Sequence, residues 1–171
     1  ELMMDRKHVL FVVMLVGVAV RSSGAIDAMK FLAVGFIKVL EECKKELNLD
    51  DHLIVDLYHY WKMEFSLMHR DTGCAIICMS KKLELLDESG NLHHGNAKEY
   101  AIKNGAGGFA VITKYLSVMI TVIHECEAKT KDIADDCSRV LELAKCFRVG
   151  IRELKWEPQV DVIINEVLTE I

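Results

Sequence analysis

The sequence has few of the residues that break helices and few of the patterns that make strands. Its 171 residues include one proline and ten glycines, and 51% are hydrophobic. This composition argues against a disordered chain or an array of domains joined by linkers. Few runs alternate between apolar and polar residues, whereas apolar spacings of three and four recur. Because the length is typical of one domain, we expect a single all-α domain.

The sequence also lacks the motifs of common enzyme classes. It contains no Gly-x-Ser-x-Gly elbow, no His-Glu-x-x-His, no phosphate-binding loop and no dinucleotide-binding fingerprint. A small secreted lipid-acting enzyme of the phospholipase kind is a rival hypothesis. Such an enzyme needs a Gly-rich calcium loop and a His and Asp pair beside a double cysteine, and neither is present. We therefore expect a non-enzymatic protein with no catalytic residues and no cofactor.

No apolar run is long enough to cross a membrane. The run from Val9 to Val20 is about a dozen residues long, whereas a spanning helix needs roughly 20. Together with the basic residues Arg6 and Lys7, it predicts a secretory signal peptide over residues 1–24. These residues carry three of the 21 Lys and Arg and two of the 26 Asp and Glu, so the net charge without them is −6. No basic patch with interleaved aromatics remains, and nucleic acid is not an expected partner.

Cysteines are present in an even number in a chain that carries an export signal. This combination predicts three disulfides, each worth on the order of 2–4 kcal/mol, although spacing alone leaves their pairing open. The spacings contain no close Cys-x-x-Cys pair, so we expect no metal. The cysteines are Cys43, Cys74, Cys78, Cys126, Cys137 and Cys146.

The run from Gly73 to Leu83 is apolar with helical character. Positions i and i+4 share one face of a helix, so the sulfurs of Cys74 and Cys78 can each reach a different neighbouring segment. Ser80 lies beside an apolar stripe of the same helix. It is either a satisfied serine of a buried core helix or a polar point in an apolar cavity. Periodicity and turn residues predict further helices over 27–47, about 50–68, 97–104, 109–127 and 137–154.

Two segments offer groups that respond to protons. The polar loop from Asp87 to Asn96 holds His93 and His94, which are either solvated or part of a pH switch, because imidazole titrates near ~6.5. The tail from Trp156 to Ile171 has apolar residues at helical spacing with acidic residues between them. The tail is either docked permanently or docks only when these carboxylates are protonated, since burying an unpaired carboxylate is costly.

The six-cysteine spacing resembles that of the insect odorant-binding proteins, with three residues between the second and third cysteines and eight between the fifth and sixth. Four stretches are similar to the moth pheromone-binding proteins in particular, and the resemblance covers residues 25–171. The general odorant-binding proteins share Cys-Ala-Ile-Ile-Cys-Met-Ser. The stretches are Asp56-Leu57-Tyr58-His59-Tyr60-Trp61, Gly73 to Ser80, Gly90-Asn91-Leu92-His93-His94-Gly95-Asn96-Ala97, and Leu154-Lys155-Trp156-Glu157-Pro158.

The resemblance implies a compact fold of six or seven helices around an apolar cavity. It pairs Cys43 with Cys78, Cys74 with Cys137, and Cys126 with Cys146. The ligands of the family are long-chain alcohols, acetates and aldehydes. Phe36 and Phe147 would hold the ligand between them, and Ser80 would hydrogen-bond its oxygen. The remaining lining residues would be Met29, Trp61, Ile76, Leu92 and Tyr100.

The resemblance also implies a carrier that releases its ligand in acid. The carrier would be secreted into the antennal sensillum lymph, as a monomer or weak homodimer, and would meet an olfactory receptor or the neuron membrane. Near an acidic membrane, a protonated tail would dock and expel the ligand. The switch residues would be His93, His94, His124, Asp161, Glu166 and Glu170.

Two points stay open within the resemblance. The nearest alternative is a general odorant-binding protein for plant volatiles. In addition, the stretch from Phe109 to Ile123 is longer by about five residues and more apolar than the family pattern. This difference leaves open the part of the cavity wall to which that stretch contributes.

Overall fold

The structure is a computed structural model that describes residues 24–104 and 108–170. The predicted signal peptide lies outside these residues except for Gly24. Within the described ranges the only β-type pairing is an isolated bridge between Leu86 and Leu92, so the all-α prediction is confirmed. Residues 24–37 are helical, followed by α2 (Leu40–Glu46), α3 (His52–Lys62), the 3-10 turn η1 (Phe65–Leu67), α4 (Arg70–Lys82), α5 (His94–Asn104), α6 (Gly108–Thr130), α7 (Asp136–Glu153) and α8 (Val160–Glu170).

Several helix boundaries differ from those predicted. Helix α5 begins at His94 instead of residue 97, so His94 lies on a helix and not in the polar loop expected over 87–96. The helix expected over 27–47 is interrupted by a turn at residues 38–39. The helix expected to reach residue 68 ends at Lys62, because Met63 adopts a left-handed conformation with φ of 61°. The amide of Glu64 then donates to the carbonyl of His59 at 2.9 Å, which closes the helix end. Apolar periodicity continues past this point, which is why it did not reveal the end.

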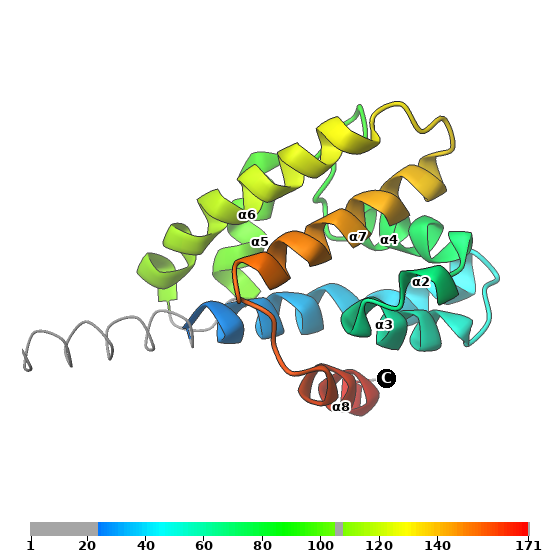
Figure 1. The fold of residues 1–171 in the computed structure, drawn as a ribbon, viewed down its shortest axis with the longest axis horizontal. Helices are drawn as coiled ribbons and strands as arrows, with labels where there is room; N and C mark the ends of the chain where they lie inside the picture. Colours follow the sequence, from blue (N-terminus) through cyan, green and yellow to red (C-terminus); the bar gives the residue numbers. More distant parts are fainter. Residues whose placement is uncertain (1–23, 105–107, 171) are drawn as a thin grey trace, which may run out of the picture.

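Helices α6 and α7 pack against each other, and α6 lies along the upper edge of the molecule in this view (Figure 1). These two run antiparallel through the loop 131–135, and α4 packs against α7. The helix over 24–37, α2 and α3 cover the lower side in this view, and α8 lies beyond α3. The start of α7 is capped by Asp135, whose carboxylate accepts from the amide of Ser138 at 2.8 Å. Arg70, at the start of α4, donates to both oxygens of Asp135 at 2.9 and 2.5 Å.

Three disulfides join these helices, and they are the pairs that the family resemblance implies. Cys43–Cys78 joins α2 to α4, Cys74–Cys137 joins α4 to α7, and Cys126–Cys146 joins α6 to α7. The two cysteines on α4 therefore bind different neighbours, as their i, i+4 spacing predicts. Gly73 allows the close approach of α4 to α7, because a Cβ there would lie 1.8 Å from the carbonyl oxygen of Cys137.

Two clusters of buried apolar residues hold the fold together. One joins the helix over 24–37 to α2, α3 and α4, and includes Trp61 and Met79. The other joins the same first helix to α5, α6 and α7, and includes Tyr115 and Ile151. Each fully buried aliphatic side chain contributes roughly 1.5–3 kcal/mol. The first helix contributes residues to both clusters, so it links the two parts of the core.

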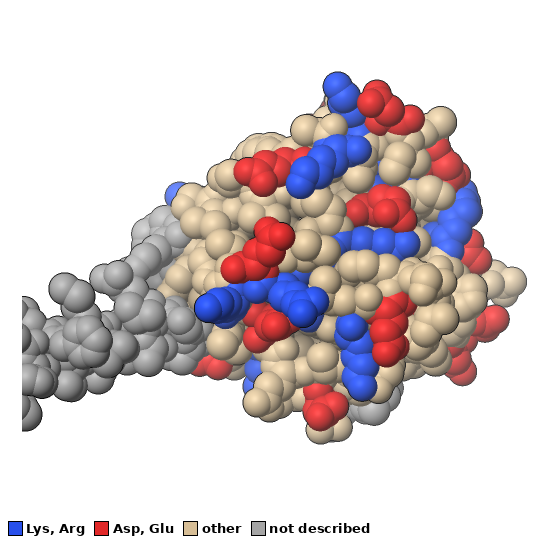
Figure 2. All heavy atoms as spheres, viewed as in Figure 1, with Lys and Arg blue, Asp and Glu red and all other residues tan. Residues whose placement is uncertain are grey.

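Charged residues of both signs mix on the surface. On the face shown in Figure 2, Lys and Arg lie among Asp and Glu, and neither sign forms a continuous field. Among residues 24–104 and 108–170, none of the helices combines the length and apolar character needed to span a membrane.

Candidate functional site

The main cavity lies between the helices and has a volume of about 360 Å³. Its wall is built from the helix over 24–37, α2 to α7 and the loop between α4 and α5. Most of the lining side chains are aliphatic or aromatic. Such a cavity suits an apolar ligand, because concave sites lined by apolar side chains with few polar groups bury most of a small ligand's surface.

All eight residues predicted to contact ligand lie on the wall of this cavity. They come from the first helix, α3, α4, the loop after α4, α5 and α7, so the fold gathers residues that are far apart in the sequence. Their contact with a ligand stays a prediction. They are Met29, Phe36, Trp61, Ile76, Ser80, Leu92, Tyr100 and Phe147.

The polar groups on the wall are few and mostly engaged. The hydroxyl of Tyr100 donates to the carbonyl of Leu32 at 2.9 Å. Burial raises the pKa of both Tyr60 and Tyr100 well above the usual range, so both phenols are neutral at physiological pH. The indole Nε1 of Trp61 is buried and has no hydrogen-bond partner among the described residues. Ser80 also lies on the wall, and its hydroxyl is the polar group predicted to bind a ligand oxygen.

Trp61 is held in place by a buried cation. Arg148 is 3% exposed, and its guanidinium carbon lies 5.2 Å from the centre of the Trp61 ring. Its Nη2 donates to the carbonyl of Trp61 at 2.8 Å and to the carboxylate of Glu157 at 2.9 Å. This network orients the indole and ties α3 to α7 and to the segment before α8.

Sequence reasoning missed a large part of the wall. In particular, the stretch whose role was left open, residues 109–123, supplies Leu116, Met119, Ile120 and Ile123. Helical periodicity marks such residues as inward-facing, but does not separate those that border a cavity from those in the packed core. The side chains of residues 109–114 lie outside the described part. Further wall residues that were not predicted include Leu53, Leu57, Met68, Thr72, Leu85, Leu86, Val140 and Leu143.

The three histidines predicted to form a pH switch separate into a pair and a single residue. His94 Nε2 lies 3.1 Å from His124 Nε2, which joins the start of α5 to α6. His124 Nδ1 lies 2.7 Å from the carboxylate of Glu127, and Glu127 lines the cavity. His93 instead accepts from the backbone amide of Asn96 at 3.1 Å through Nδ1.

The tail is helical and docked outside the cavity. In α8, Ile163 is fully buried and packs with the cluster that contains Trp61, while Asp161 is exposed. Figure 1 shows α8 beside α3. Where the side chains of the tail are described, up to Asn165, none lines the cavity. The side chains of Glu166 and Glu170, both predicted switch residues, lie outside the described part.

The chain is similar to a family of insect proteins over most of its length. The sequence profile of the PBP/GOBP family matches residues 31–149. "Pheromone-binding protein 2" of Epiphyas postvittana is 39% identical over 170 residues, which are 99% of this chain and 100% of that protein. "General odorant-binding protein 2" of Manduca sexta is 38% identical over 140 residues, covering 82% of this chain and 84% of that one. The crystal structure of pheromone-binding protein 3 of Epiphyas postvittana is 55% identical, with a TM-score of 0.61, and covers 68% of this chain and 96% of that chain.

Proposed function

The chain belongs to the PBP/GOBP family, whose members are odorant carriers and not enzymes, and we propose that it carries long-chain pheromone alcohols, acetates or aldehydes. The observation that carries this proposal is the cavity of about 360 Å³ with its nearly continuous apolar wall. Burying about 14 methylenes at roughly 0.8 kcal/mol each contributes about 11 kcal/mol before ordering costs. After these costs, micromolar or tighter binding is expected.

The ligand chain runs between Phe36 and Phe147 in this proposal, and its oxygen accepts a hydrogen bond from Ser80. An alcohol, ester or aldehyde oxygen accepts this hydrogen bond, whereas a saturated hydrocarbon leaves the Ser80 hydroxyl without a partner in the ligand. The cavity therefore favours a long chain with one polar end.

The alternative ligand class is plant volatiles. It is favoured by the similarity to general odorant-binding proteins, since the Manduca sexta protein is 38% identical where the pheromone-binding protein is 39% identical. The two classes differ in length, so an affinity that rises up to long chains supports pheromone carriage. Preference for short or cyclic volatiles would support the alternative.

Release in acid is the second part of the proposal. A contact between His94 Nε2 and His124 Nε2 requires one nitrogen to donate and the other to accept. When both rings are protonated, both nitrogens are donors and both rings are positive, so the contact breaks. Loss of this contact loosens the start of α5 from α6 beside the cavity.

The tail would then replace the ligand. Protonation of Asp161, Glu166 and Glu170 lowers the cost of burying α8, so the state with an inserted tail binds more protons and is favoured as the pH falls. The protein would be secreted, after removal of residues 1–24, into the antennal sensillum lymph. It would deliver ligand to an olfactory receptor at the neuron membrane, where the surface is acidic.

Displacement of a fluorescent apolar probe tests both parts. Oxidised residues 25–171 are titrated with C12 to C18 alcohols, acetates and aldehydes at pH 7 and pH 5. Binding at pH 7 that is lost at pH 5 supports carriage and switching, equal binding at both removes the switch, and no binding at either refutes the carrier.

A truncated protein separates the tail from the histidines. The cut is placed after Gln159, because Trp156 packs on Tyr115 with ring centroids 5.1 Å apart and Glu157 pairs with Arg148. If the truncated protein still releases ligand at pH 5, the tail is not the switch. The double variant H94Q/H124Q then tests the histidine pair.

A further inference from the structure

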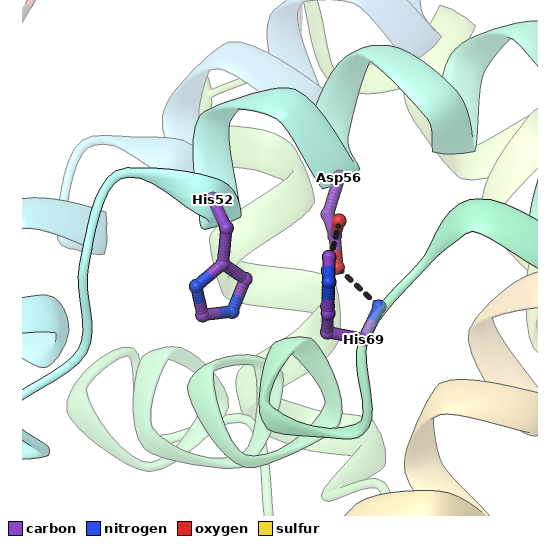
Figure 3. A group of neighbouring side chains, drawn as sticks. All are labelled: His52, Asp56 and His69. Carbon is purple, nitrogen blue, oxygen red and sulfur yellow. Dashed lines mark hydrogen bonds and ion pairs between the residues drawn. The ribbon is translucent and has the colours of Figure 1, made fainter.

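A cluster of metal-binding side chains lies outside the cavity, at the start of α3. His52 and Asp56 sit one helical turn apart on one face of α3, and His69 immediately precedes α4. One potential ligand atom from each of the three lies within 4.8 Å of those of the other two. Figure 3 shows the edge of the His52 ring turned toward the His69 ring, with Asp56 beside them. The two ring centres are 4.7 Å apart.

The carboxylate of Asp56 is rigid and buried. It is 0% exposed, and its Oδ2 accepts from the backbone amide of His69 at 2.6 Å and from the hydroxyl of Thr72 at 2.5 Å. Its Oδ1 lies 2.9 Å from His69 Nδ1. One oxygen therefore holds the start of α4, while the other faces a ring nitrogen and is open to exchange.

His52 presents an unused nitrogen to this group. Its Nδ1 is bonded to the carboxylate of Asp50, which fixes the proton on Nδ1 and leaves a lone pair on Nε2. That Nε2 is buried and has no hydrogen-bond partner among the described residues. A buried, unpartnered nitrogen costs free energy, and a cation in contact with it removes that cost.

We propose that His52 Nε2, a carboxylate oxygen of Asp56 and a ring nitrogen of His69 form a Zn²⁺ site with one position left for water. Two imidazoles and a carboxylate are ligands that zinc prefers. Ligand atoms of a tetrahedral site with bonds of ~2.0 Å lie roughly 3.3 Å apart, so the widest pair here closes by about 1.5 Å. The His69 side chain is 61% exposed, so a turn of its ring toward His52 displaces water and little protein.

Such an ion would stabilise one wall of the cavity by linking two of its segments. It joins the first residue of α3 to the residue before α4, across the segment that contains η1. Met68 and Thr72, on either side of the His69 and Asp56 pair, both line the cavity. No metal was expected from the sequence because the chain has no Cys-x-x-Cys pair. The ligands of this site are not cysteines, so the absence of that pair does not exclude it.

Calorimetric titration with ZnCl₂ at pH 7.5 in a non-chelating buffer tests the site. The metal-free, oxidised protein is expected to bind one Zn²⁺ with micromolar or tighter affinity. H52Q and H69Q should each weaken binding by at least ~10-fold. The matched control is H59Q, since His59 lies on the same helix and its Nδ1 is 2.8 Å from a carboxylate of Glu64, outside the cluster. A second control, H94Q, removes the other histidine pair.

The ¹⁵N chemical shifts of the histidine rings in the wild-type protein provide a second measurement, which does not require that any variant folds. Added Zn²⁺ should shift the Nε2 resonance of His52 and leave those of His59 in place. The proposal is overturned if wild-type protein binds no Zn²⁺. It is also overturned if H52Q and H69Q bind as tightly as wild type, or if binding is lost in H94Q or H59Q instead.

Discussion

Enlarging Ala33 should shorten the preferred ligand. Ala33 lies on the first helix, is half-buried against the cluster that contains Trp61, and borders the cavity. The variant A33L adds three carbon atoms at this position. Because the cavity has a limited volume of about 360 Å³, carbon added to the wall excludes carbon of the ligand.

The expected magnitude follows from the burial of methylenes. Each methylene that no longer fits forfeits roughly 0.8 kcal/mol, so three cost about 2.4 kcal/mol for a ligand that fills the wild-type cavity. This corresponds to a loss of about 60-fold in affinity. A ligand shorter by about three carbons should bind A33L nearly as well as wild type, since it leaves the added side chain room.

Displacement of the apolar probe by linear alcohols of increasing length measures this shift. The control is A128L, the same exchange at an exposed position of α6 that does not border the cavity. It should leave the length profile unchanged. Melting temperatures of both variants check that each is folded. The reasoning is refuted if the optimum length of A33L equals that of wild type, or if affinity falls equally for every length.

Three further substitutions test the site and the fold. S80A should weaken binding of alcohols by roughly 3- to 10-fold through loss of one hydrogen bond, and should not weaken binding of a hydrocarbon of equal length. G73A should lower the melting temperature strongly, because the new Cβ would lie 1.8 Å from the carbonyl of Cys137; G95A, whose Cβ would meet only the His93 ring at 3.3 Å, should change it little. D135N should lower the melting temperature at neutral pH but not in strong acid. Hydrogen bonds from Arg70 hold the pKa of Asp135 well below its usual range, so the stabilisation is present above about pH 4 and is lost as the pH falls through the folded-state pKa. An effect of D135N that is the same at pH 7 and pH 2 would contradict this cause.

The pattern of the sequence was sufficient for the helical class, whereas the apolar cavity was expected from the resemblance to the odorant-binding proteins. Spacings of three and four predict the all-α class, and Cys74 and Cys78 at i and i+4 predict that α4 is joined to two neighbours. These features are local, because a helix relates each residue to those three and four positions away. The end of α3 was not predictable in this way, since it depends on the left-handed conformation of one residue, Met63, rather than on apolar spacing.

The sequence by itself determined the class of fold, the number of cysteines available for pairing and the residue types that can line an apolar site. Only the tertiary structure decided which residues meet. His94 and His124 are 30 positions apart, yet their ring nitrogens lie 3.1 Å from each other. His52, Asp56 and His69 form one cluster because the turn after α3 brings the start of α4 back beside the start of α3. Contacts of this kind depend on how helices are placed by packing and disulfides, and periodicity along the chain carries no information about that placement.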